Sequence, residues 1–191
     1  MTQARSRRYL CMPRPVIAAG AYSLSTVQDE DIESIRQWRN AQMDVLRQTA
    51  PISPEQQRTY FAQQIWPSMD TPTPTNILLA FREDERLIGY GGLVHLSWEH
   101  RRGEVSFLLD SAYVSNQDEH DRLFAEYLGL IAEFAFTDLG LHRLTAETYA
   151  IREAHIRVME ANGFVREGRL RDHVLIDGVY VDSLVHGWVS P

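Results

Sequence analysis

A long amphipathic helix with strand-like runs on both sides constrains the fold of this sequence most. Three strand-like runs, at 76–82, 86–98 and 102–110, precede this helix, and a further strand, a short helix and two strands follow it. The apolar side chains of the long helix recur at helical spacing and form one stripe: Leu123, Tyr127, Leu130, Ile131 and Phe134. This order of elements predicts a single mixed α/β domain.

Local signals mark the ends of several elements. Ser53 to Gln56 combines a capping serine, proline at the first helical position and a capping-box glutamine, so we expect a helix to begin there. Asp177-Gly178 between two apolar runs predicts a tight hairpin turn. Gly89, Gly91 and Gly92 lie inside one strand and predict a bulge or a close backbone approach.

Composition excludes several classes of protein. The 191 residues contain no apolar run long enough to span a membrane, so we expect no membrane segment. The single Cys11 cannot form an internal disulfide, and no Cys/His spacing predicts a metal site. Every one of the 19 basic residues is arginine, which is typical of a GC-rich bacterial genome, and we expect a cytoplasmic, bacterial protein.

The first residues differ from the rest of the chain. Four arginines and two prolines fall within residues 5–15, so we expect residues 1–19 to form a loose basic arm and residues 20–191 to form the folded domain. The net charge of the whole chain is −7, and the part after the arm is more acidic still. An acidic domain disfavours nonspecific binding to nucleic acid, whereas the arm could contact an anion.

The C-terminal half carries a specific pattern. It contains Leu139-Gly-Leu-His-Arg-Leu144, then Ala154-His-Ile-Arg-Val-Met-Glu-Ala-Asn-Gly-Phe164, and then Arg166-Glu-Gly-Arg-Leu-Arg-Asp-His173. This pattern resembles the GNAT acyltransferases, in particular the branch with the ribosomal-protein alanine N-acetyltransferases, over residues 20–189. The resemblance implies an α/β (α+β) fold whose mixed central sheet is splayed between its fourth and fifth strands and flanked by helices.

The same resemblance implies a donor site for acetyl-CoA in that splay. The family's pantetheine arm pairs with the fourth strand, which here includes Ser106, Phe107 and Leu108. Its pyrophosphate binds at the start of the long helix, where Arg122 matches a motif position. Arg152 matches an asparagine of this branch and is a further candidate for donor binding.

The pyrophosphate loop departs from the family pattern. No glycine occurs between Gly103 and Gly129, whereas the family's loop depends on glycines that expose backbone N–H groups. Asp118, Glu119 and Asp121 cluster at the helix start and would repel phosphate. The sequence therefore predicts weak binding of acetyl-CoA. A simpler interpretation of the segment is a well-capped helix.

Candidate catalytic residues also follow from matched positions. Glu104 matches an acidic residue that could deprotonate the acceptor ammonium, although it could equally pair with Arg101 or Arg102. His155 could act as a general acid or base, and Tyr149 ends the fifth main strand, where a side chain can face the cleft. Met159 replaces a tyrosine that often protonates the leaving thiolate. In the first two helices and the loop after them, Trp38, Arg39 and Trp66 are candidates for the acceptor pocket.

Three functions remain open at this point. The resemblance implies N-acyl transfer to a primary amine of a small molecule or peptide N-terminus. A homodimer is a further expectation for the protein. A second hypothesis keeps the chemistry but uses aminoacyl-tRNA or a carrier-protein thioester as donor, with the basic arm in contact with tRNA. A third hypothesis is a non-catalytic binding domain, which would explain both the missing glycines and Met159.

Overall fold

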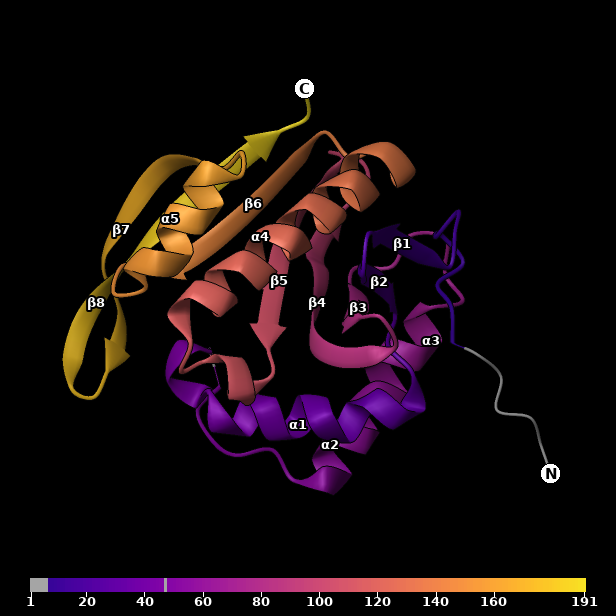
Figure 1. The fold of residues 1–191 in the computed structure, drawn as a ribbon, viewed down its shortest axis with the longest axis horizontal. Coiled ribbons are helices and arrows are strands. Elements are labelled where there is room, and N and C mark those ends of the chain that lie inside the picture. Colours follow the sequence, from indigo (N-terminus) through magenta and orange to yellow (C-terminus); the bar gives the residue numbers. More distant parts are fainter. Residues whose placement is uncertain (1–6, 47) are drawn as a thin grey trace.

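A mixed β-sheet with helices packed on it forms the core of the protein. The computed structural model describes residues 7–46 and 48–191, and within these the sheet has eight strands in the order β1-β2-β3-β4-β5-β6-β8-β7 (Figure 1). Only β5 and β6 pair in parallel among the described strands. The strands are β1 Val16–Ala19, β2 Tyr22–Thr26, β3 Ile77–Glu83, β4 Arg86–Ser97, β5 Arg102–Leu109, β6 Arg143–Tyr149, β7 Val165–Ile176 and β8 Val179–Val189.

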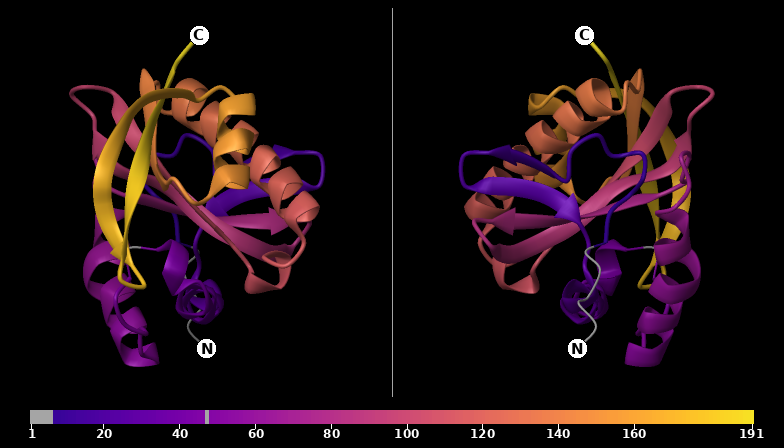
Figure 2. Two further views of the ribbon diagram at one scale, coloured as in Figure 1. Left: turned by 90° about the vertical axis from the view of Figure 1, so that its left-hand side faces the viewer. Right: turned by 90° about the vertical axis from the view of Figure 1, so that its right-hand side faces the viewer.

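Helices cover one face of the sheet and one of its ends. They are α1 Ile32–Ala41, α2 Pro54–Tyr60, α3 Trp66–Ser68, α4 Gln117–Glu133 and α5 Glu153–Ala161. Figure 1 shows α4 and α5 crossing the same face, with α1 and α2 at the end toward which β5 points. Figure 2 shows α1 and α2 projecting beyond that end of the sheet. This arrangement brings α1 against β5.

The expected amphipathic stripe lies on α4. Leu123, Tyr127, Leu130, Ile131 and Phe134 are all buried, with at most 2% of each residue exposed. The α-helix continues as a π-helical turn over Phe134–Asp138 and ends before Gly140, whose φ of 63° suits glycine. The helix therefore supplies the apolar layer on which the sheet packs, as the sequence predicted.

The other local signals are confirmed as well. The Ser53 side chain accepts from the Gln56 backbone N–H, while the Gln56 side chain accepts from the Ser53 N–H, forming a capping box. Asp177 and Gly178 both have positive φ in the β7–β8 hairpin, as a type I′ turn requires. A Cβ on Gly91 would lie 2.0 Å from the Ser106 carbonyl oxygen, so the glycines of β4 do mark a close backbone approach.

The expected loose arm at residues 1–19 is wrong for its described part. Tyr9, Met12 and Ile17 are buried in the core, and Val16–Ala19 forms β1 at an edge of the sheet. The Tyr9 hydroxyl accepts from the Leu78 N–H at 3.0 Å. The arm packs because large apolar residues lie among its arginines, and Arg14 pairs with Asp138 at 2.7 Å. Residues 1–6 lie outside the described part of the chain.

None of the described helices is both long enough and apolar enough to cross a membrane.

Candidate functional site

The sheet splits between β5 and β6. These strands pair in parallel only at Arg102–Arg143, Gly103–Leu144 and Glu104–Thr145, after which β6 stays paired with β8 as far as Tyr149. The splay expected from the sequence is therefore confirmed, with its apex at Glu104. A cavity of about 250 Å³ lies at the splay and is lined from both strands, α4 and α5. We call this cavity the cleft.

Glu104 places a carboxylate at the apex of the cleft. It lines the cleft, and its Oε2 lies 3.0 Å from Nδ1 of His95. His95 also lines the cleft, but 68% of its side chain is exposed, because β4 has an irregular register between Val94 and Ser97 and φ of His95 is 51°. A hydrogen bond of Glu104 thus goes to His95, a partner that the sequence did not indicate. Glu104 lies in the cleft and His95 is exposed to solvent, so this hydrogen-bonded pair offers a route for a proton from the cleft to solvent.

His155 lies in the wall of the cleft and is kept neutral. Its ring stacks on Phe124 with 3.9 Å between centroids and lies 6.3 Å from the Phe107 ring. Burial lowers the pKa of His155 well below its ordinary value, and the nearby Arg152 charge lowers it further. A neutral imidazole can accept a proton, so the expected role of His155 as a general acid or base stays a prediction. Its position in the cleft remains compatible with a role in orienting neighbouring groups.

Arg152 brings a positive charge to the same wall. It caps α5, lines the cleft, and has its Nη2 3.4 Å from Nδ1 of His155. Burial lowers the pKa of Arg152, and the Asp44 carboxylate partly offsets this effect. Arginine stays protonated under such shifts, so the cleft contains a half-buried cation.

The three candidate residues for donor binding on β5 differ in whether they line the cleft. Ser106 and Phe107 line the cleft, whereas Leu108 is buried opposite Tyr90 in the β4–β5 ladder and does not line it. The expected pairing of a donor with β5 concerns main-chain groups, so at Leu108 it stays a prediction. The Ser106 carbonyl accepts from the Tyr127 hydroxyl at 2.7 Å, an interaction that the sequence did not predict.

The start of α4 is a capped, acidic helix terminus. The Asn116 side chain accepts from the Glu119 N–H, and Asp118 and Glu119 lie in the first turn. Arg122 was expected to face the donor, but it donates to the Tyr22 hydroxyl on β2 and lies over that ring. This expectation is wrong because the helical twist directs position 122 toward β2. The simpler interpretation, a well-capped helix, describes this segment.

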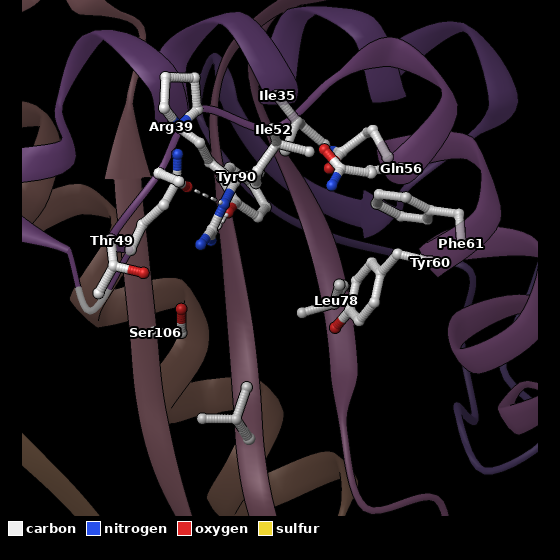
Figure 3. Close-up of a pocket in the computed structure, with 15 residues that line it drawn as sticks. Ile35, Arg39, Thr49, Ile52, Gln56, Tyr60, Phe61, Leu78, Tyr90 and Ser106 are labelled. Atoms are coloured by element: carbon white, nitrogen blue, oxygen red, sulfur yellow. Dashed lines mark hydrogen bonds between the residues drawn. The ribbon is translucent and has the colours of Figure 1, made fainter.

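A larger cavity of about 600 Å³ lies under α1, α2 and the loop between them. We call it the α1–α2 cavity. Arg39, Val94 and Ser106 line both cavities, so the two adjoin. Figure 3 shows Arg39, Thr49 and Ser106 on one side of the cavity, with Tyr60 and Phe61 on the other.

Only one of the three acceptor candidates reaches this cavity. Arg39 donates to the Tyr90 hydroxyl at 2.8 Å and to Gln48 Oε1 at 3.2 Å. Trp38 is buried in the core, and Trp66 packs against Phe61 under the Arg7 guanidinium. Trp38 and Trp66 line neither cavity, so the expectation that they shape the pocket directly is wrong.

Tyr149 and Met159 both line the cleft. Tyr149 ends β6 on the wall opposite β5 and is 9% exposed, while Met159 is buried beside Thr148. The tyrosine provides a hydroxyl at the splay, whereas the thioether of Met159 cannot release a proton. Among the described residues, no group of three or more His, Cys, Asp or Glu side chains is arranged to hold a metal ion.

Sequence comparison identifies a family model over most of the chain. The model described as "Acetyltransferase (GNAT) domain" matches residues 24–185. The uncharacterized N-acetyltransferase YoaA of Bacillus subtilis (strain 168) is 29% identical over 110 residues, 58% of this chain and 59% of its own. The probable N-acetyltransferase YjcK of the same strain is 30% identical over 108 residues, 56% of this chain and 58% of its own. The chain thus spans less than two thirds of the length of these curated relatives.

Solved structures share the fold. Spermidine N-acetyltransferase of Vibrio cholerae, in complex with CoA and spermine, superposes with a TM-score of 0.75 at 19% identity, covering 88% of this chain and 95% of that one. A structure described as a putative acetyltransferase has a TM-score of 0.67 at 19% identity, covering 92% of this chain and 87% of the other. At this identity the likeness shows the fold alone.

Proposed function

The chain belongs to the GNAT acetyltransferase family, and we propose that it transfers an acetyl group from a thioester to a primary amine of a small molecule or peptide N-terminus. The observation that carries this proposal is Glu104 at the apex of the splay. There the cleft adjoins the α1–α2 cavity, so a thioester and an amine can meet beside one carboxylate. A small-molecule amine is supported by the fold shared with spermidine N-acetyltransferase.

The cleft fits the arm of an acetyl-CoA donor. Beyond Glu104, β5 pairs with β4 but no longer with β6, so the described part of the chain leaves one edge of its backbone open to a ligand. When bound, acetyl-CoA would supply the thioester carbonyl that the amine attacks. Ser106 and Phe107 would flank the arm, and Arg152 would provide the positive charge for an anionic donor group.

The start of α4 does not fit a pyrophosphate in the way the family pattern implies. Asn116 already accepts from an N–H of the first turn, and Asp118 and Glu119 add negative charge there. We therefore assign the phosphate contact to Arg152 rather than to the helix terminus. Compared with a helix terminus that donates two N–H groups to the pyrophosphate, the loss of these charge-assisted hydrogen bonds costs about 1.5 to 3 kcal/mol each. Acetyl-CoA binding would then be weaker by at least a hundredfold.

Two side chains would move the protons. Glu104 accepts a proton from the acceptor ammonium and can pass it through His95 to solvent, which frees the nitrogen lone pair for attack. As the new C–N bond forms, the nitrogen loses its second proton to Glu104, which again passes it to solvent. As the C–S bond breaks, the Tyr149 hydroxyl donates a proton to the leaving thiolate and is reprotonated from solvent. His155 stays neutral and orients Arg152 through their contact.

Glu104→Gln tests the proposal. We expect kcat/KM for thiol release from acetyl-CoA, measured with a panel of primary amines, to fall by about 10²- to 10⁴-fold, with an unchanged melting temperature. Glu99→Gln is the matched control, because Glu99 is exposed in the neighbouring β4–β5 turn. Full activity of Glu104→Gln, or no transfer to any amine by the wild type, would contradict the proposed function.

A second candidate keeps the chemistry and changes the donor. The capped, acidic start of α4 favours a donor without a pyrophosphate at that place, such as a carrier-protein thioester or aminoacyl-tRNA. Calorimetry with acetyl-CoA separates the two candidates. Measurable binding that Arg152→Gln abolishes supports acetyl-CoA as donor, whereas the absence of binding favours the second candidate. A tRNA contact and a homodimer stay predictions.

A further inference from the structure

No carboxylate lines the α1–α2 cavity among the residues that the structure describes. Within that set the only charged lining side chain is Arg39, and the polar ones are neutral hydroxyl and amide groups such as Thr49, Gln56 and Tyr60. Apolar side chains, including Ile52 and Phe61, form the rest of the wall. A polycationic amine would therefore meet a positive charge and no compensating acid in this cavity.

Arg39 has only neutral partners in the described part of the chain. Its Nη1 donates to the Tyr90 hydroxyl and its Nε to Gln48. Within residues 7–46 and 48–191, no carboxylate forms an ion pair with it, whereas Arg36 on the same helix pairs with Glu33 at 2.6 Å. A half-buried guanidinium without an acidic partner is suited to bind a carboxylate of a ligand in a charge-assisted pair.

Arg39 and Glu104 bring opposite charges to the junction of the two cavities. Arg39 lines both the cleft and the α1–α2 cavity, and Glu104 lines the cleft at its apex. A ligand with an ammonium near Glu104 and a carboxylate near Arg39 would match both charges. The rest of such a ligand would enter the α1–α2 cavity, whose described wall residues are uncharged beyond Arg39.

We propose that the acceptor is an aminocarboxylate: a primary amine that carries a carboxylate close by, on an uncharged and partly apolar body such as that of a neutral amino acid. This inference rests on the proposed function. Arg39 is the specificity-determining residue, because it binds the carboxylate and repels a second ammonium. Glu104 receives the proton of the reacting amine.

Matched acceptors test the inference. L-leucine, L-leucinamide and 1,4-diaminobutane present a carboxylate, a neutral amide and a second ammonium, respectively. We expect kcat/KM for acetyl transfer to leucine to exceed that for each of the other two at least tenfold, mainly through a lower KM. Greater or equal transfer to 1,4-diaminobutane or leucinamide would overturn the inference, as would no transfer to leucine by a protein that acetylates other amines.

Variants of Arg39 test whether this residue causes the preference for an acceptor with a carboxylate. Arg39→Gln should raise KM for leucine and bring the ratio of leucine to leucinamide close to one. Arg39→Lys, which keeps the charge, should retain the direction of the preference, and it serves as the test if Arg39→Gln does not fold. Arg58→Gln on the exposed face of α2 is the control and should behave as wild type. Unchanged preference in Arg39→Gln and Arg39→Lys alike would overturn the assignment, while the Glu104→Gln experiment still decides the proposed function.

Discussion

Two interruptions of the β-ladder flank β5, and they differ in what fills them. On the β4 side, the Tyr127 hydroxyl stands between paired residues: it accepts from the Gly92 N–H at 2.6 Å and donates to the Ser106 carbonyl at 2.7 Å. On the β6 side, the strands part after Glu104 and a cleft of about 250 Å³ remains. We call these the closed gap and the open gap.

The difference supports the proposed place of ligand binding. An unpaired backbone group in a protein interior costs free energy, so a gap without a function is filled by the chain itself. Tyr127 is completely buried and does this at the closed gap. The open gap is lined by Glu104, Arg152 and Tyr149, which are chemically active groups, and it leaves its strand edge for a substrate.

The largest expected effect comes from blocking the closed gap. In Gly91→Ala, the new Cβ would lie 2.0 Å from the Ser106 carbonyl oxygen and 2.5 Å from the Tyr127 hydroxyl oxygen. Overpacking against backbone cannot relax by a rotamer change, so we expect a loss of about 3 kcal/mol or more in the free energy of unfolding, measured by urea denaturation. Gly129→Ala is the matched control, since a Cβ there contacts nothing within 4 Å.

The control variant Gly129→Ala should change the free energy of unfolding in the opposite direction. Gly129 is exposed in the middle of α4, so alanine should stabilise the protein by roughly 0.5 to 1 kcal/mol through helix propensity. Wild-type stability of Gly91→Ala would show that β4 and β5 can separate locally. The closed gap would then be no more rigid than the open one.

Removing the Tyr127 hydroxyl, which fills the closed gap, should have the next largest effect on the free energy of unfolding. Tyr127→Phe keeps the ring on α4 but leaves the Gly92 N–H and the Ser106 carbonyl without their partner. We expect a loss of about 2 to 3 kcal/mol in the free energy of unfolding and faster hydrogen exchange at the Gly92 amide. Tyr180→Phe, on an exposed residue of β8, should change neither measurement. If both variants behave alike, Tyr127 does not close the gap.

A third prediction concerns the wall of the open gap and depends on pH. Burial holds the pKa of His155 well below its value of about 6.5 in an unfolded chain. Below that value the unfolded chain binds a proton that the folded protein excludes. The free energy of unfolding should therefore fall as pH decreases from about 7 to 5, by up to about 1.4 kcal/mol per pH unit from this residue.

His155→Gln should flatten this dependence. The difference in unfolding free energy between wild type and variant should shrink toward acidic pH, because the variant has no proton to exclude. His142→Gln, at an exposed histidine, is the control and should keep the wild-type slope. An identical slope in all three proteins would show that water enters the open gap and solvates His155.

The closed and open gaps differ in how far the sequence predicted them. The matched motifs placed the splay between the fourth and fifth main strands, and the glycines of β4 predicted a bulge or a close approach, because each signal reflects a backbone constraint. Tyr127 fitted the apolar stripe of α4, and nothing in the spacing revealed where its hydroxyl points. The direction of a polar group depends on neighbours that are distant in the chain.

The same reason explains the errors in the candidate site. Arg122 matched a motif position but donates to Tyr22, which is 100 positions away in the chain. Tyr9 and Met12 lie among arginines and prolines, so composition indicated a loose arm, whereas their apolar bodies fill the core. Arg39 was a candidate, but only the structure showed that its partners are neutral. Charge partners are set by tertiary contacts, which a single sequence does not reveal.

The smallest effect is expected at the seam where β5 and β6 still pair. Thr145 donates from its hydroxyl to the Gly103 carbonyl at 3.3 Å, a long hydrogen bond across this three-residue seam. Valine has the same shape and favours strands, so Thr145→Val should cost less than about 1 kcal/mol in the free energy of unfolding and leave kcat/KM unchanged. The two halves of the sheet do not depend on this bond, because α4 packs against both α5 and β2. Separate unfolding of β6–β8 in Thr145→Val, seen as a second transition, would show instead that the seam holds the open gap in place.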